Sequence, residues 1–162
     1  MKRFFNLFSQ QKGHEALGET SKQSDDTLES SQEQPRRISP DNIRTLGRNE
    51  IFVFGSNVHG FHGGGAAAAA MRQFGAIWGQ GEGLQGQSYA IPTMEGIENL
   101  SAAVSRFTEF AEKHPELRFL VTRIGCGIAG YSVEEIAPLF EGCIELGNVA
   151  LPTDFFKILR KK

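Results

Sequence analysis

The chain has 162 residues, of which 17 are Lys or Arg and 19 are Asp or Glu, so its formal net charge at pH 7 is −2. This length gives room for one ordinary domain. The balanced charge excludes a polycation, and nucleic acid is not an expected partner. Cys126 and Cys143 are too few for a disulfide framework and lack the spacing of a four-ligand zinc site. We therefore expect no metal, no cofactor and a cytoplasmic location.

The first 47 residues are predicted to form a disordered polar tail. Between Leu17 and Ile38 the only aliphatic residue is Leu28, and residues 1–47 together have seven Lys or Arg against seven Asp or Glu. Residues 1–47 are therefore assigned to the tail and residues 48–162 to the domain.

The extreme N-terminus, residues 1–8, is a short amphipathic segment with three phenylalanines and two basic residues. This composition suits an anchor on an anionic membrane surface. A frayed terminus explains the same residues, and the apolar run is too short for a secretory signal. Membrane contact is thus an alternative that we do not favour.

From Asn49 onward, short apolar runs alternate with helical segments, which is typical of an α/β sheet with crossover helices. The expected strands are Ile51–Phe54, Ser88–Ile91, Arg118–Ile124 and Asn148–Leu151. The expected helices are Gly64–Phe74, Ile97–His114, Ser132–Glu141 and a short turn at Asp154–Leu159. The stretch Gly75–Gly86 has too many glycines for an element of its own and is predicted to be a flexible loop.

Two glycine-rich turns each follow an expected strand and lead into an expected helix. The first contains Gly63, Gly64 and Gly65, and the second runs from Gly125 to Gly130. Glycine lets backbone N–H groups approach an oxygen without a Cβ in the way, and a helix start adds unpaired N–H groups and a positive dipole end. Two such turns in one domain predict a site for a pyrophosphate.

The second turn also satisfies the dinucleotide pattern G-x-G-x-x-G, and Ser132 with Glu135 predicts a capping box at the next helix. A dinucleotide fold needs an acidic residue about 20 positions later, for which Asp154 is the candidate. Too little chain follows Gly130 to complete such a fold with a substrate domain. A redox enzyme is therefore not expected.

Together these motifs resemble a known family. The sequences FVFGSN (52–57), HGGGAA (62–67), SYAIPT (88–93) and IGCGIAG (124–130) resemble a short, uncharacterised branch of the macrodomains found in bacteria and phages. The resemblance covers roughly residues 49–155. It implies a small three-layer α/β fold with a mixed, mostly parallel central sheet.

The resemblance also implies a ligand, because macrodomains bind ADP-ribose at the carboxyl ends of the central strands, with the phosphates held by two glycine-rich loops. ADP-ribose, or a molecule that carries it, would be the partner. The strand end and first loop would contribute Gly55, Ser56, Asn57, Gly63, Gly64, Gly65 and Ala66. The second loop would contribute Gly125, Cys126, Gly127, Ile128, Ala129, Gly130 and Tyr131.

Departures from the hydrolytic macrodomains leave catalysis open. One group carries an aspartate just after the glycine run, where this chain has Ala66 to Ala70. Another uses a lysine near the end of the first helix and an aspartate in the second loop, where this chain has Met71-Arg72-Gln73 and Ala129. Within residues 48–162 the aspartate that commonly reads the adenine amino group also has no counterpart, since Asp154 is the only Asp there.

Several polar residues have both a functional and a structural interpretation. His62 and, less favourably, His59 could act as a general base, or could satisfy backbone groups. Asn57 could hold a ribose hydroxyl or a water, or form a turn. Cys126 could be an activated thiolate, although packing is favoured. Arg123 could approach a phosphate, although a surface ion pair is simpler.

Three functions remain open from the sequence. The favoured one is binding of ADP-ribose or a related nucleotide diphosphate. The second is hydrolysis of an ADP-ribosyl or phosphoester bond with Asn57 and His62 as the catalytic residues. The third is an interaction module of phage or host that has lost its ligand.

Overall fold

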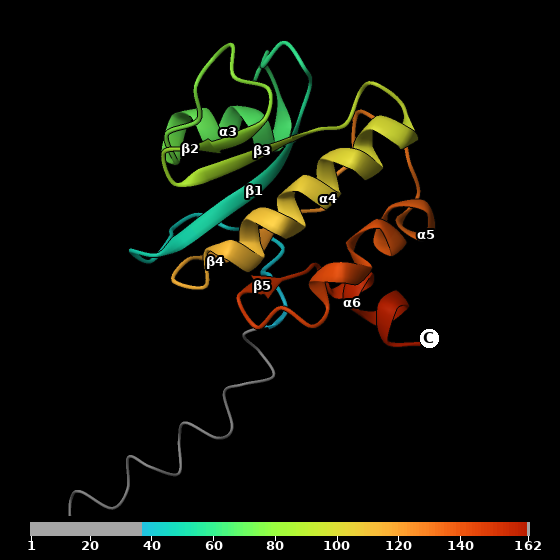
Figure 1. The fold of residues 1–162 in the computed structure, drawn as a ribbon. Helices are drawn as coiled ribbons and strands as arrows, with labels where there is room; N and C mark the ends of the chain where they lie inside the picture. The colour runs from blue at the N-terminus through green and yellow to red at the C-terminus, as the bar shows by residue number, and fades with distance from the viewer. Residues whose placement is uncertain (1–36, 162) are drawn as a thin grey trace, which may run out of the picture. The chain divides into compact units, whose positions relative to one another are not determined.

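The computed structural model describes residues 37–161. Its centre is a five-stranded sheet in the order β2-β3-β1-β4-β5 (Figure 1). The strands are β1 (Glu50–Ser56), β2 (Gly83–Gln85), β3 (Ser88–Pro92), β4 (Arg118–Val121) and β5 (Val149–Ala150). Strand β1 pairs in parallel with both β3 and β4, β4 pairs in parallel with β5, and β2 is antiparallel to β3. The expected α/β class with a mixed, mostly parallel sheet is confirmed.

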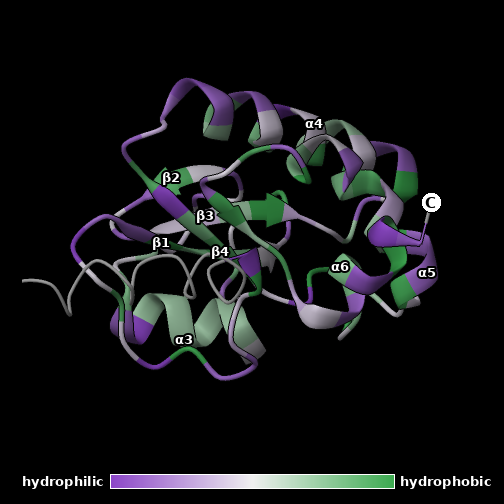
Figure 2. Ribbon diagram, turned by 90° about the horizontal axis from the view of Figure 1, so that it is seen from below, coloured by the Kyte–Doolittle hydropathy of each residue, from purple (hydrophilic) through white to green (hydrophobic). Residues whose placement is uncertain are grey.

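The helices are α3 (Gly65–Gln73), α4 (Ile97–Lys113), α5 (Val133–Ile136) and α6 (Thr153–Arg160), with a 3₁₀ helix η4 (Ala137–Cys143). Figure 2 shows α3 on one side of the sheet and α4 on the other. The alternation along β1 explains this arrangement: Ile51 and Val53 enter the core under α4, while Phe52 and Phe54 enter a separate cluster under α3. The described part of the chain thus has three layers.

The alanine-rich helix α3 lies close to the sheet because its side chains are small. Ala67 and Ala70 are buried against Phe52, Phe54 and Phe74, whose rings fill the space that the methyl groups leave. The helix was predicted to run from Gly64 to Phe74, and these two residues are its N-cap and C-cap.

Helix α4 follows its apolar periodicity. Leu100, Ala103, Val104, Phe107 and Ala111 are buried, at spacings of one to four residues along a single face. The ring of Phe107 lies 5.1 Å from that of Tyr89 on β3 and 5.4 Å from that of Phe119 on β4. The same helix is therefore fixed to both neighbours of β1.

The predicted helix Ser132–Glu141 is in fact two short helices. The capping box forms as expected: Glu135 N donates to Ser132 Oγ at 3.2 Å, and Ser132 N donates to the Glu135 carboxylate at 2.8 Å. After one turn of α5 the chain tightens into η4, whose first turn contains Pro138. Proline has no N–H for a helical hydrogen bond, so it fits the start of a new turn better than the interior of a longer helix.

The strand bounds also differ from expectation. Strand β1 begins one residue earlier and ends two residues later than predicted, and β3 ends one residue later. Strand β4 ends at Val121 instead of Ile124, because Ile124 N donates to Thr122 O at 2.7 Å in a tight turn. Strand β5 covers Val149–Ala150, and Leu151 forms an isolated bridge beyond it.

The prediction that Gly75–Gly86 has no element of its own is wrong. It contains β2, which extends the sheet at the edge of β3. The buried Gln85 side chain accepts from Ile77 N at 2.7 Å and donates to Gln80 O at 3.1 Å, so an amide side chain supplies the contacts that hold the loop. A Cβ at Gly81 would lie 2.3 Å from Asn57 O. These glycines permit close backbone approach, which sequence composition does not distinguish from flexibility.

The predicted domain boundary at residue 48 is also too late. The compact unit that contains the sheet begins at Arg36. Ile38 bridges Leu151, Ser39 N donates to Leu151 O at 2.9 Å, and Ile43 packs against the cluster under α3. The cause is backbone pairing, which polar side chains do not reveal. Residues 1–36, including the predicted membrane-contacting segment 1–8, lie outside the described residues.

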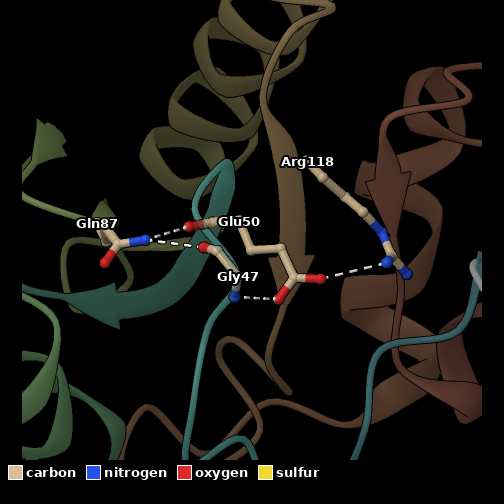
Figure 3. Close-up of polar contacts among 4 residues, drawn as sticks. All are labelled: Gly47, Glu50, Gln87 and Arg118. Carbon is tan, nitrogen blue, oxygen red and sulfur yellow. Dashed lines mark hydrogen bonds and ion pairs between the residues drawn. The ribbon is translucent and has the colours of Figure 1, made fainter.

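A polar cluster ties the amino ends of the parallel strands together (Figure 3). Glu50 at the start of β1 accepts from Gly47 N at 2.9 Å and pairs with Arg118 at the start of β4 at 3.3 Å. Gln87, just before β3, donates to Gly47 O at 3.0 Å and to Glu50 O at 3.3 Å. The cluster holds the register of three strands at the end of the sheet opposite their carboxyl termini.

Candidate functional site

A cavity of about 280 Å³ lies at the carboxyl ends of β1, β3 and β4. This is the edge at which ligands bind in open α/β sheets, and the volume is at the small end for a ligand pocket. Residues of both glycine-rich turns line the cavity, and the second turn lies against the end of β1, since a Cβ on Gly55 would lie 3.9 Å from Gly125 N. Ten of the predicted ligand-binding residues line the cavity: Gly55, Ser56, Asn57, Gly64, Gly65, Ala66, Gly125, Gly127, Ile128 and Ala129.

Four predicted residues do not line it: Gly63, Cys126, Gly130 and Tyr131. Seven residues outside the predicted set do: Phe61, Ala67, Thr93, Met94, Thr122, Arg123 and Ile124. Of these, Arg123 was weighed as a phosphate contact, and five lie within three residues of the end of β3 or β4. Their position after a strand was the available signal, because the carboxyl ends of parallel strands meet at one edge.

The first glycine turn places free N–H groups at the cavity wall. Gly64 caps α3 with extended backbone and no side-chain hydrogen bond. Within residues 37–161, the N–H groups of Gly65, Ala66 and Ala67 have no acceptor, and the first helical bond beyond them runs from Ala68 to Gly64 O at 3.2 Å. A Cβ on Gly64 would meet nothing within 4 Å. Packing therefore does not require glycine at this position, and the space in front of it is open for an anion.

The second glycine turn is a tight loop held by its own backbone. Tyr131 N donates to Gly125 O at 2.9 Å, and Gly130 N donates to Gly127 O at 3.0 Å. Gly125 has a φ of +77°, and a Cβ there would lie 3.0 Å from Ile136 Cδ1, so glycine is needed for the turn itself. A Cβ on Gly127, by contrast, would meet nothing within 4 Å.

The surroundings of Cys126 do not favour a thiolate. Burial raises the pKa of its thiol, Arg123 lowers it, and Asp154 and Glu134 raise it. Its side chain packs against the core cluster under α4. Packing, the favoured interpretation, is what the structure shows.

Asn57 is a turn former that also lines the cavity. Its Oδ1 accepts from Phe61 N and its Nδ2 donates to Phe61 O, both at 3.1 Å. Gly60 N donates to Asn57 O at 2.9 Å in the same loop. The side chain therefore closes the loop 57–61 and brings Phe61 to the mouth of the cavity.

The two histidines of this loop lie away from the cavity. His62 is 2% exposed, and its ring stands edge-on to Phe54 at 5.2 Å. Its Nε2 lies 3.1 Å from Gln80 O and its Nδ1 lies 3.4 Å from Ser56 Oγ. His59 is exposed and stacks on Phe61 at 5.4 Å. Neither lines the cavity, so neither ring is placed to take a proton directly from a ligand there.

Arg123 forms the expected surface ion pair, with Asp154 at 3.3 Å. Its side chain is 56% exposed and it also lines the cavity. The lining residues of this cavity within the described chain include no Asp, Glu, Lys or His, so Arg123 is their one formal charge.

A second cavity of about 770 Å³ adjoins the first. The two share Gly65, Ala66, Thr122 and Arg123 as lining residues. Asp41 and Asn42 line the far part of the second cavity. The sequence analysis missed them because it placed the domain boundary after them; the aliphatic residues on either side, Ile38 and Ile43, were the signal that this segment belongs to the domain.

The remaining observations limit the chemistry. Within residues 37–161 no group of three or more His, Cys, Asp or Glu side chains is arranged to hold a metal ion. In the same range no helix has the length and apolar character needed to cross a membrane. Comparison of the chain with protein-family models, curated proteins and solved structures finds no match.

Proposed function

We propose that the chain binds a nucleotide diphosphate, with ADP-ribose as the first candidate, across the two adjoining cavities. The observation that carries the proposal is their shared wall. Gly65 and Ala66, at the start of a nine-residue helix, supply N–H groups that have no acceptor in the described part of the chain, and Arg123 supplies a cation. A diphosphate at this wall would leave room for a group on either side.

The two sides differ in chemistry, as the two ends of such a ligand do. The second cavity offers Asp41 and Asn42, which can accept from or donate to the edge of a base. The lining of the first cavity includes Ser56, Asn57 and Thr93, whose polar groups suit a sugar. The macrodomain pattern includes an aspartate that reads the adenine amino group, and residues 48–162 have no counterpart. Once the domain is extended to residue 37, Asp41 is available for this role.

Binding is favoured over hydrolysis by Asn57 and His62. The Asn57 amide already has two partners in its own loop, and His62 does not line the cavity. The interaction module without a ligand remains the rival, and it predicts no nucleotide binding.

The test is calorimetric titration of the full chain with ADP-ribose, and with ADP, AMP and NAD as comparisons. We expect micromolar binding of ADP-ribose that exceeds the binding of AMP by at least tenfold, because AMP lacks the diphosphate. Absence of heat with all four ligands would refute the proposal and favour the interaction module.

A pair of matched variants locates the site. Gly127→Glu puts a carboxylate into the first cavity, and Gly147→Glu puts one on an exposed loop outside it; at both positions a Cβ meets nothing within 4 Å. We expect the first to weaken ADP-ribose binding and the second to leave it unchanged. Equal effects would remove the second turn from the site.

A further inference from the structure

A buried hydrogen-bonded chain reaches the floor of the first cavity. Ser56, at the carboxyl end of β1, lines the cavity and is 5% exposed. Its Oγ lies 3.4 Å from His62 Nδ1, and His62 Nε2 lies 3.1 Å from the backbone carbonyl oxygen of Gln80. The order is hydroxyl, imidazole, fixed acceptor, which is the arrangement of an activated nucleophile: nucleophile, base and a third group that orients the base.

The Gln80 carbonyl decides which ring nitrogen carries the proton. A carbonyl oxygen only accepts, so the hydrogen of neutral His62 is on Nε2 and Nδ1 is left as an acceptor. The Ser56 hydroxyl can donate to this Nδ1 or to its other neighbour, Asn57 O at 3.2 Å. Rotation about one torsion moves the hydroxyl hydrogen between the two, so the imidazole is available as a base toward Ser56.

The surroundings keep the imidazole in place. The edge-on contact with Phe54 fixes one side of the ring. Gln80 is fixed in turn, because its side chain donates to Leu84 O at 3.1 Å and its carbonyl also accepts from Gln85. A Cβ on Gly60 would lie 2.4 Å from Gln80 N, so the loops on either side of His62 are in close contact. The base is thus held by both loops and reaches the cavity only through Ser56.

We propose that Ser56 is a catalytic nucleophile, with His62 as its general base, for hydrolysis of a small carboxylic ester. The inference does not depend on which anion binds in the cavity. Gly65, Ala66 and Ala67 line the same cavity, and within residues 37–161 their N–H groups have no acceptor, so they are the candidate donors for the oxyanion that develops on the acyl carbon. Methyl groups of Ala66 and Ala67 provide an apolar wall for a short acyl chain.

The reaction balances without a cofactor. Ser56 Oγ forms a bond to the acyl carbon while its proton passes to His62 Nδ1. The ester C–O bond then breaks, and the departing alcohol takes a proton from a water molecule in the cavity, which leaves hydroxide. The hydroxide attacks the acyl carbon, the bond to Ser56 Oγ breaks, and Oγ takes back the proton from His62 Nδ1, which releases the carboxylic acid and restores the hydroxyl. Throughout, the Nε2–H group of His62 keeps its hydrogen bond to Gln80 O.

The first test is covalent labelling of the full chain with a fluorophosphonate, in which Ser56 Oγ replaces fluoride on phosphorus. Trypsin releases residues 49–72, where Ser56 is the only hydroxyl residue, so an adduct on this peptide localised by fragmentation reports on Ser56 alone. Exposed Ser105, on α4, is the internal control for an ordinary serine. We expect Ser56 to be labelled at least tenfold faster than Ser105, and His62→Gln to lose this preference. No adduct on Ser56 of the folded protein, or equal labelling in His62→Gln, would overturn the proposal.

A second measurement does not require the buried histidine to be replaced. With p-nitrophenyl acetate, the wild-type chain should release a burst of nitrophenolate that approaches one equivalent, as an acyl-serine accumulates. Ser56→Ala removes only a hydroxyl and should abolish the burst. A burst of the same size in Ser56→Ala would show that the acyl group is not on Ser56.

Discussion

Replacement of Gly64 by Asp should stabilise the fold and weaken the site at the same time. Gly64 caps α3 with extended backbone, a φ of −150° and a ψ of 168°, and its missing Cβ would meet nothing within 4 Å. Asp is a better N-cap than Gly by a few tenths of a kcal/mol, and its charge at the positive end of the helix adds about 0.3–1 kcal/mol. We therefore expect the free energy of unfolding to rise by about 0.5–1 kcal/mol, which raises Tm by roughly 2–4 °C for a domain of this size.

The effect on binding has the opposite sign. The new carboxylate would accept the N–H groups that we assign to the phosphates, and it would repel them. Two charges about 6 Å apart interact by about 3 kcal/mol at an effective dielectric constant of about 20, and the exposure of Gly64 reduces this value. A decrease in ADP-ribose affinity of roughly 10- to 100-fold follows.

Calorimetric titration and thermal unfolding of three variants separate these effects. Gly64→Asn caps the helix without a charge, so it should keep only the capping part of the gain in Tm and lose less affinity. Gly147→Asp adds the charge on an exposed loop outside both cavities and should leave affinity unchanged. Wild-type affinity in Gly64→Asp would refute the assignment of the helix start as the anion site, and a lower Tm would refute the capping argument.

Three further predictions concern the fold. Gly81→Ala should lower the unfolding free energy by about 1–3 kcal/mol in urea titration, because its Cβ would lie 2.3 Å from Asn57 O; a change as small as that of Gly147→Ala would contradict the close approach. Burial raises the pKa of Tyr89 to about 12, so the contribution of Tyr89 to stability is complete below the unfolded pKa of 10 and is lost as the pH rises toward 12. Tyr89→Phe should therefore flatten the plot of unfolding free energy against pH between pH 10 and 12. An unchanged slope would assign the pH dependence to other groups. A chain that begins at residue 48 should melt at a lower temperature than one that begins at residue 36, because it lacks the bridge of Ile38 to Leu151; equal Tm values would restore the later boundary.

The site was partly predictable because its glycines lie between a strand and a helix in the sequence. Gly64 and Gly127 were expected at a phosphate site from the strand–turn–helix order alone, and both line the cavity. Asp41 was not expected, because Ile38 and Ile43 are a weak signal in a polar stretch and the backbone bridge from Ile38 to Leu151 leaves no pattern in the sequence. His62 could not be placed either, because nothing in the sequence shows that Gln80, 18 positions later, will accept from its ring.

The sequence by itself determined the α/β class, the helices α3 and α4, the capping box at Ser132 and the position of the two glycine turns. These features depend on local periodicity and on the φ/ψ freedom of single residues, which are properties of short segments. Tertiary structure alone decided the edge strand β2, the start of the domain near Arg36 and the chain from Ser56 through His62 to Gln80. Each of these arises from contacts between backbone and polar groups that are distant along the chain, and such contacts are set only when the apolar core has brought the segments together.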